Sequence, residues 1–160
     1  MIEIVEYKSE YAKDISQLII RNLLEVNIND YKYEEMEEHV KKFSIDSLNE
    51  MFEKREKVFV ALDNQKPVGT AGIEKSWNNA DGEYWVLTVF VNPDYHKNGI
   101  GKKLIFAVEE YARNVLKAKL LIVPASKTAW KFYEKIGYIH KDGMKKLNEN
   151  NVYLMQKKFV

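Results

Sequence analysis

The chain has 160 residues, which suits one domain spanning residues 1–160 with room for a sizeable core. Its 25 Lys and Arg and 24 Asp and Glu nearly cancel to a net charge of +1, so bulk charge gives no reason to expect nucleic acid or an anionic membrane surface as a partner. The absence of cysteine excludes disulfides and a thiolate nucleophile, and no apolar run reaches the roughly eighteen residues of a membrane span. We therefore expect a cytoplasmic protein that does not act at a membrane.

The first third of the chain predicts one strand followed by helices. Residues 2–7 alternate apolar and polar side chains, which is typical of a short strand. Ser9 is suited to cap a first helix, whose apolar positions keep helical spacing as far as Val26. A second helix is expected over residues 33–43 and a short third one within residues 44–52. We interpret the glutamates of the second helix as a solvated face, the alternative being attraction for a cationic acceptor.

The middle of the chain predicts strands joined by hairpins. Short apolar runs at 58–62 and 68–75 are separated by a turn that contains Pro67. A second hairpin leads into residues 84–91, which are rich in aromatic and β-branched side chains and therefore indicate a core strand. Together with the N-terminal strand, these segments predict a four-stranded meander.

A glycine-containing loop follows this core strand and precedes a helix from residue 100 to about 116. Gly99 and Gly101 flank the helix start, where side chains would keep a ligand away from the free backbone N–H groups. His96, Lys97 and Lys102 surround them, although a helix N-terminus disfavours cations by a few tenths of a kcal/mol. A bound anion would reverse this penalty, so the loop predicts a phosphate or pyrophosphate site. The alternative is a turn with solvated lysines.

The last third completes an α/β fold. Residues 120–123 form a continuous apolar run that indicates a buried strand, which a right-handed crossover would place parallel to the strand at 84–91. Ser126 can cap the next helix, and Gly137 can end it in a left-handed conformation. Residues 138–140 and 151–159 predict a closing strand pair. The expected sheet is mixed and mostly antiparallel, with helices on both faces.

The loop does not match the common nucleotide-binding motifs. A dinucleotide fingerprint requires a glycine where Leu104 stands, and a Walker A loop requires four residues between its glycines and a Ser or Thr after its lysine. The segment VNPDYHKNGIG instead resembles the pyrophosphate loop of the GNAT superfamily of acyl-CoA-dependent N-acyltransferases, with His96 at the position usually held by Gln or Arg. Downstream, ASKTAWKFYEKIGY resembles the second GNAT motif, with Ser126 at its Asn position. The resemblance covers about residues 58–159.

The resemblance implies a fold in which the two parallel strands splay apart and admit the acyl-CoA arm. Carried over residue by residue, it implies that pantetheine contacts the first of these strands, that the pyrophosphate binds the loop amides, and that the second motif contributes one residue. The cofactor-binding residues expected on this basis are Val89, Phe90, Val91, Lys97, Asn98, Gly99, Ile100, Gly101, Lys102 and Ser126.

Catalytic residues are also expected from the resemblance. Tyr133 matches the family tyrosine that protonates the departing thiolate, the alternative being a tyrosine that only packs. Many relatives place a glutamate base on the strand after the long helix, but residues 120–123 contain no carboxylate. Glu83 is our candidate base; otherwise a water chain, or an amine that arrives neutral, must serve. The three histidines are scattered without metal-ligand spacing, so no metal is expected.

These observations favour an N-acetyltransferase that transfers the acetyl group of acetyl-CoA to a primary amine of a small molecule or peptide. The alternative is a non-catalytic acyl-CoA-binding regulatory module. Aromatic residues of the first helices and the nearby loops, Tyr31, Tyr33, Phe43 and Trp77, are candidates for an acceptor pocket but equally ordinary as core. We expect a monomer or a homodimer.

Overall fold

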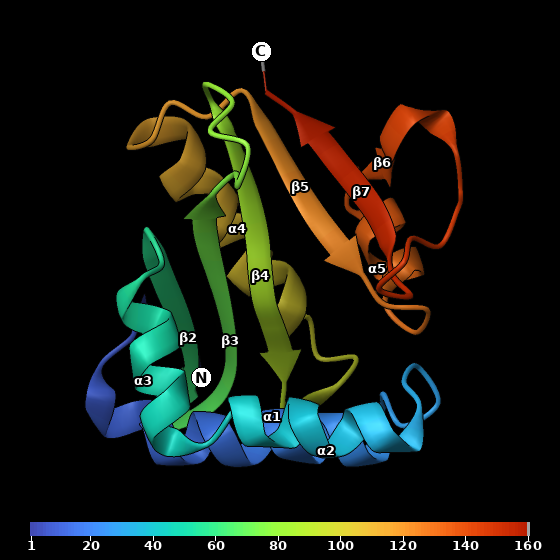
Figure 1. The fold of residues 1–160 in the computed structure, drawn as a ribbon. Coiled ribbons are helices and arrows are strands. Elements are labelled where there is room, and N and C mark those ends of the chain that lie inside the picture. The colour runs from blue at the N-terminus through green and yellow to red at the C-terminus, as the bar shows by residue number, and fades with distance from the viewer. Residues whose placement is uncertain (160) are drawn as a thin grey trace.

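The computed structural model describes residues 1–159, and its centre is a seven-stranded mixed sheet with helices on both faces (Figure 1). The order of strands is β1-β2-β3-β4-β5-β7-β6. The strands are β1 (Ile2–Glu6), β2 (Lys57–Asp63), β3 (Lys66–Lys75), β4 (Glu83–Val91), β5 (Leu120–Ala125), β6 (Ile139–His140) and β7 (Tyr153–Lys158). The helices are α1 (Ala12–Glu25), α2 (Tyr33–Lys42), α3 (Ile45–Glu53), α4 (Ile100–Asn114) and α5 (Trp130–Lys135).

The parallel strand pair is short and then opens. Strands β1 to β4 form the expected antiparallel meander. β4 pairs with β5 in parallel from Glu83 opposite Leu120 to Trp85 opposite Ile122. Beyond this point the C-terminal ends of the two strands separate, and β5 pairs along its other edge with β7 (Figure 1). The predicted mixed sheet with one splayed parallel pair is therefore confirmed.

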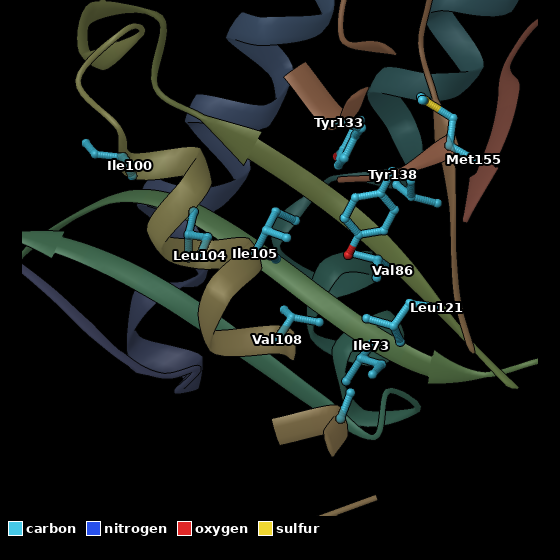
Figure 2. Packing of buried hydrophobic residues seen from close by; sticks show 14 of the residues in the cluster. Ile73, Val86, Ile100, Leu104, Ile105, Val108, Leu121, Tyr133, Tyr138 and Met155 are labelled. Carbon is cyan, nitrogen blue, oxygen red and sulfur yellow. The ribbon is translucent and has the colours of Figure 1, made fainter. Parts of the chain in front are cut away.

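Two apolar layers hold the helices on the sheet. On one face, α4 packs against β1 to β4 through a buried stripe that includes Ile100, Leu104, Ile105 and Val108 (Figure 2). On the other face, α1 packs against β3 and β4 and joins α2 and α3 around a second cluster. This arrangement brings the start of α4 and the end of α1 to the same end of β4, where the functional site lies.

One detail of the predicted helices is wrong. Ser9 does not cap α1, because it begins a 3-10 turn (Ser9–Tyr11) and α1 starts only at Ala12, without a side-chain cap. α4 ends at Asn114 with Val115 as its C-cap, close to the predicted end. Gly137 also adopts the expected left-handed conformation, with φ of 101°, after α5.

Candidate functional site

A cleft of about 800 Å³ opens where β4 and β5 separate. One wall is the second half of β4, and the opposite wall is the end of β5 together with α5. The loop between β4 and α4 closes one end, and the last turn of α1 with the residues that follow it contributes a further side. The cleft therefore combines the two segments whose motifs the sequence analysis identified.

A β-bulge in β4 lies within the part of the strand that lines this cleft. The register of β3 and β4 shifts between Thr70 and Gly72, and Thr88 has a φ of 57°. This region is unfavourable for a β-branched residue and costs of order 1–3 kcal/mol. Arg55 holds the bulge, since its Nη2 donates to Thr88 Oγ1 at 3.0 Å while its Nη1 pairs with Glu74 at 3.2 Å. The bulge redirects the edge of β4 within the splayed segment, which begins after Trp85.

The loop after β4 has the geometry of an anion site. Gly99 is the N-cap of α4 in a left-handed conformation, with φ of 76°. The first four N–H groups of a helix have no helical partner, and the first turn of α4 carries no acidic residue. A Cβ on Gly101 would lie 3.2 Å from the Phe132 ring, so the backbone approaches the opposite wall closely here. The loop thus presents N–H groups and lysines to the cleft, as the sequence predicted.

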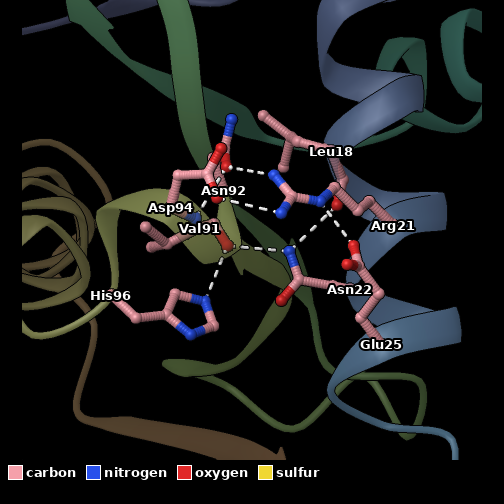
Figure 3. Close-up of polar contacts among 8 residues, drawn as sticks. All are labelled: Leu18, Arg21, Asn22, Glu25, Val91, Asn92, Asp94 and His96. Atoms are coloured by element: carbon pink, nitrogen blue, oxygen red, sulfur yellow. Dashed lines mark hydrogen bonds and ion pairs between the residues drawn. The ribbon is translucent and has the colours of Figure 1, made fainter.

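Side chains of α1 and of the loop fix the end of β4 (Figure 3). The carbonyl of Val91 accepts hydrogen bonds from Asn22 Nδ2 at 2.7 Å and from His96 Nε2 at 2.8 Å. One position away on α1, Arg21 donates to Asn92 Oδ1 and pairs with Asp94 Oδ1 at 2.9 Å. The hydrogen bond from this guanidinium lowers the pKa of the Asp94 carboxyl. No pattern in the sequence indicates that α1 reaches this loop or that His96 binds the strand.

Tyr133 lies on α5 with its side chain buried between Phe132 and Tyr138. It lines the cleft, and its hydroxyl makes no hydrogen bond within residues 1–159. Burial raises the pKa of Tyr133, so the phenol stays protonated at neutral pH. The cleft therefore contains a neutral O–H donor without a protein acceptor.

Most of the other predicted cofactor residues come together around the cleft. Its lining includes Val89, Phe90, Val91, Lys97, Gly99, Ile100, Gly101, Lys102 and Ser126. Asn98 belongs to the same loop but does not line the cleft. Ser126 Oγ accepts from the Ala129 N–H at 3.1 Å and so stabilises the turn before α5. The prediction that it caps the helix is wrong, because α5 begins only at Trp130, with Ala129 as its N-cap and no side-chain cap.

Glu83 does not belong to this site, which corrects the sequence-based hypothesis. It starts β4, whereas the cleft lies at the other end of the strand, and the rise of an extended chain puts Val91 roughly 25 Å away. Its carboxylate accepts a hydrogen bond from Ser76 Oγ at 2.6 Å. The structure therefore does not bring Glu83 together with Tyr133.

The described part of the cleft lining contains no carboxylate. Asp30, which follows α1, is a buried acid that is 6% exposed. Its Oδ2 accepts hydrogen bonds from Asn27 Nδ2 and Thr128 Oγ1, both at 2.8 Å, and both of these residues line the cleft. Asp30 thus links the segment after α1 to the turn before α5, although it does not itself line the cleft.

Of the four aromatic candidates for an acceptor pocket, the structure brings only Tyr31 to the cleft. Tyr33 is 88% exposed, and Phe43 packs against Phe90 in the second cluster. Trp77 stacks on Trp85 at the hairpin between β3 and β4, where it is 71% exposed.

Residues 1–159 contain no group of three or more His, Cys, Asp or Glu side chains placed to hold a metal ion. None of the helices in this part of the chain combines the length and the apolar character needed to cross a bilayer.

Comparisons with known proteins agree with this geometry. The family model of the GNAT acetyltransferases matches residues 20–138, and the chain belongs to this family. The structure is similar to that of the PaiA N-acetyltransferase from Thermoplasma acidophilum in complex with coenzyme A, with a TM-score of 0.83, 17% identity and coverage of 99% of both chains. It is also similar to a GNAT family acetyltransferase from Brucella melitensis in complex with acetyl-CoA, with a TM-score of 0.73, 18% identity and coverage of 100% of this chain and 89% of the other. No curated protein matches the sequence significantly.

Proposed function

We propose that the protein is an N-acetyltransferase that transfers the acetyl group of acetyl-CoA to a primary amine of a small molecule or peptide. The observation that carries this proposal is the cleft itself, in which the splayed strands, the anion loop and the Tyr133 phenol meet. The two similar structures described above hold coenzyme A or acetyl-CoA, which supports acetyl-CoA as the acyl donor. We further propose that the enzyme acts in the cytoplasm.

The residues of the cleft fit this cosubstrate. The amides and lysines around Gly99 and Gly101 suit a pyrophosphate, because the groups at a helix N-terminus have free N–H donors and favour negative charge. The exposed edge of β4 from Val89 to Val91 suits an extended arm that carries amides. When bound, acetyl-CoA would supply an activated thioester. Phe132 opposite Gly101 limits the width of the cleft at its loop end.

Tyr133 is the residue proposed to act on the leaving group. Its phenol is neutral, lines the cleft and lacks a protein acceptor, so the O–H is available to a developing thiolate. The amine must lose a proton in the same reaction. Because the described cleft lining offers no carboxylate, we propose that the amine binds in its neutral form or passes its proton to water.

The missing carboxylate also favours a second candidate function. A protein that keeps the anion loop but lacks a base would bind acyl-CoA without turning it over, as a regulatory module. Measuring the release of free CoA thiol from acetyl-CoA, with and without a panel of primary amines, separates the two. An enzyme releases thiol faster with at least one amine and forms the acetylated product, whereas a binding module shows only background hydrolysis with every amine.

A further inference from the structure

The carbonyl of Val91 is already saturated by the protein itself. Val91 pairs with Gly69 of β3, and the next amide, that of Asn92, donates to Val68 of β3. Because ladder bonds alternate between the two edges of an antiparallel strand, the N–H and C=O of Val91 point to the other edge, toward the gap. A carbonyl oxygen has two lone pairs. Asn22 and His96 use both of them (Figure 3).

The orientation of the Asn22 side chain follows from its neighbours. Its amide nitrogen lies 2.9 Å from the carbonyl of Leu18 and 2.7 Å from that of Val91. Both neighbours are acceptors only, so the group that faces them must be the NH₂ with its two donors. The side-chain oxygen therefore cannot exchange places with the nitrogen, and it points away from both carbonyls (Figure 3).

The Asn22 oxygen is an acceptor without a protein partner. Within residues 1–159 it receives no hydrogen bond, although the residue is only 4% exposed. It is not among the fully enclosed unpaired atoms, which are those of Arg55 and His140. Because Asn22 lines the cleft and its oxygen is not fully enclosed, we infer that this oxygen faces the cleft. Leaving a nearly buried acceptor unpaired costs free energy, which a ligand donor would recover.

We propose that Asn22 is a further cofactor-binding residue, whose side-chain oxygen accepts a hydrogen bond from an amide N–H of the pantetheine arm in place of the saturated Val91 carbonyl. This proposal rests on the function proposed above. Pantetheine brings two amide N–H donors into the splayed gap, and at the end of β4 the Val91 carbonyl is no longer available to them. The Asn22 oxygen is an unpaired acceptor next to the Val91 carbonyl, at the end of β4.

The test changes the ligand first and the protein second. Calorimetry compares CoA with two analogues, in each of which one pantetheine amide N–H is replaced by an ester oxygen. Wild-type protein should bind one analogue about tenfold more weakly than CoA, the range for one neutral hydrogen bond. Asn22→Leu, which has similar volume, should bind CoA about tenfold more weakly and should not distinguish that analogue from CoA. Asn22→Ser serves as a second variant if the leucine variant does not fold.

Two controls separate this contact from general damage to the site. Adenosine 3′,5′-bisphosphate lacks the pantetheine arm, so wild type and Asn22→Leu should bind it equally. Glu25→Leu changes a side chain of the same helix that is 51% exposed and does not line the cleft, and it leaves the Asn22 oxygen in place, so CoA affinity should stay within about twofold of wild type.

Three results would overturn the proposal. The first is wild-type protein that binds both ester analogues as tightly as CoA. The second is an Asn22 variant that loses affinity for the bisphosphate as much as for CoA, which would mean that Asn22 only supports the loop. The third is an Asn22 variant that binds CoA normally but has a raised KM for the amine. If wild-type protein binds no CoA at all, the proposed function itself fails, and this outcome is distinct from all three.

Discussion

At the scale of single residues, Tyr133 and the loop glycines differ in what they contribute. In the proposed function, the glycines leave room for the backbone to approach a ligand, whereas Tyr133 contributes one hydroxyl group. His96 donates to the carbonyl of Val91, and Asn22 combines a hydrogen bond to that carbonyl with a side-chain oxygen proposed to meet the cofactor. These are separable effects, since each can be removed by a substitution that leaves the packing nearly unchanged.

Replacing Tyr133 by Phe should lower turnover by about 10²- to 10⁴-fold, the usual range for a positioned acid. The ring and its contacts with Phe132 and Tyr138 remain, so cofactor affinity and stability should barely change. Because the lost interaction develops with the charge on sulfur, kcat and kcat/KM should fall together. Steady-state kinetics with an amine found in the panel provides the measurement. Equal turnover of both proteins would show that Tyr133 only packs.

Replacing His96 by Phe should weaken CoA binding about threefold to tenfold, because one of the two hydrogen bonds to the Val91 carbonyl is lost. His96→Gln is the matched control, since it keeps a side-chain N–H donor and should bind CoA nearly as wild type does. Isothermal titration of the three proteins checks this expectation. If the Phe variant binds as tightly as the Gln variant, the hydrogen bond from His96 has no part in shaping the site.

At the scale of elements, the sequence predicted what depends on local pattern. The strand at 84–91, the helix from residue 100 and the glycine-containing loop between them follow from side-chain type and spacing alone, and the structure contains all three. The bulge at Thr88 cannot be predicted in this way, because a Thr among β-branched and aromatic residues is typical of an ordinary strand. Its φ of 57° is held by Arg55, which is 33 positions away.

Contacts between residues far apart in the sequence also explain why the site can be predicted only in part. Asn22 binds Val91 across 69 positions, and a motif search along the chain cannot see such a contact. Glu83 is a carboxylate on the central strand, but sequence does not tell which end of a strand faces the cleft until the splay is placed. Glu83 lies at the end of β4 that pairs with β5, whereas the cleft lining on this strand begins at Val86.

A buried polar network should hold α4 to the last strands. Glu109 of α4 is 6% exposed, accepts from Tyr138 Oη at 2.8 Å and pairs with Lys157 Nζ at 3.1 Å. Glu109→Leu would leave the Tyr138 hydroxyl unpaired and would remove the carboxylate beside Lys157, which keeps only its hydrogen bond to the Ile136 carbonyl at 3.0 Å. The free energy of unfolding should therefore fall by about 2 kcal/mol, less than for a fully buried pair because Lys157 is partly exposed.

Glu110→Leu is the matched control, since it lies next to Glu109 on α4 with a side chain that is 46% exposed. It should change the free energy of unfolding by less than about 0.5 kcal/mol. Urea denaturation of the two variants and the wild type gives the comparison. Equal losses in both variants would mean that the network around Glu109 adds no stability beyond that of an exposed charge.

At the scale of the whole molecule, β4 and β5 pair at one end of the sheet and are separated at the other. Apolar layers on both faces hold β1 to β4 rigidly, while β5 turns away from β4 to pair with β7. The cleft is therefore a consequence of sheet topology, and its walls come from segments at both ends of the chain. A ligand that binds across these walls should stabilise the folded state as a whole.

The most direct test of this account is a thermal-shift titration with acetyl-CoA on the wild type and on Gly101→Asp. Ligand at about a hundredfold over its Kd should add roughly 2.7 kcal/mol to the stability of the wild type and raise its Tm. The variant should fold but show no shift, because the aspartate places a side chain against Phe132 and a negative charge where the pyrophosphate would lie. No shift of folded wild-type protein at millimolar acetyl-CoA, or an equal shift of both proteins, would contradict the assignment of this cleft as the acetyl-CoA site.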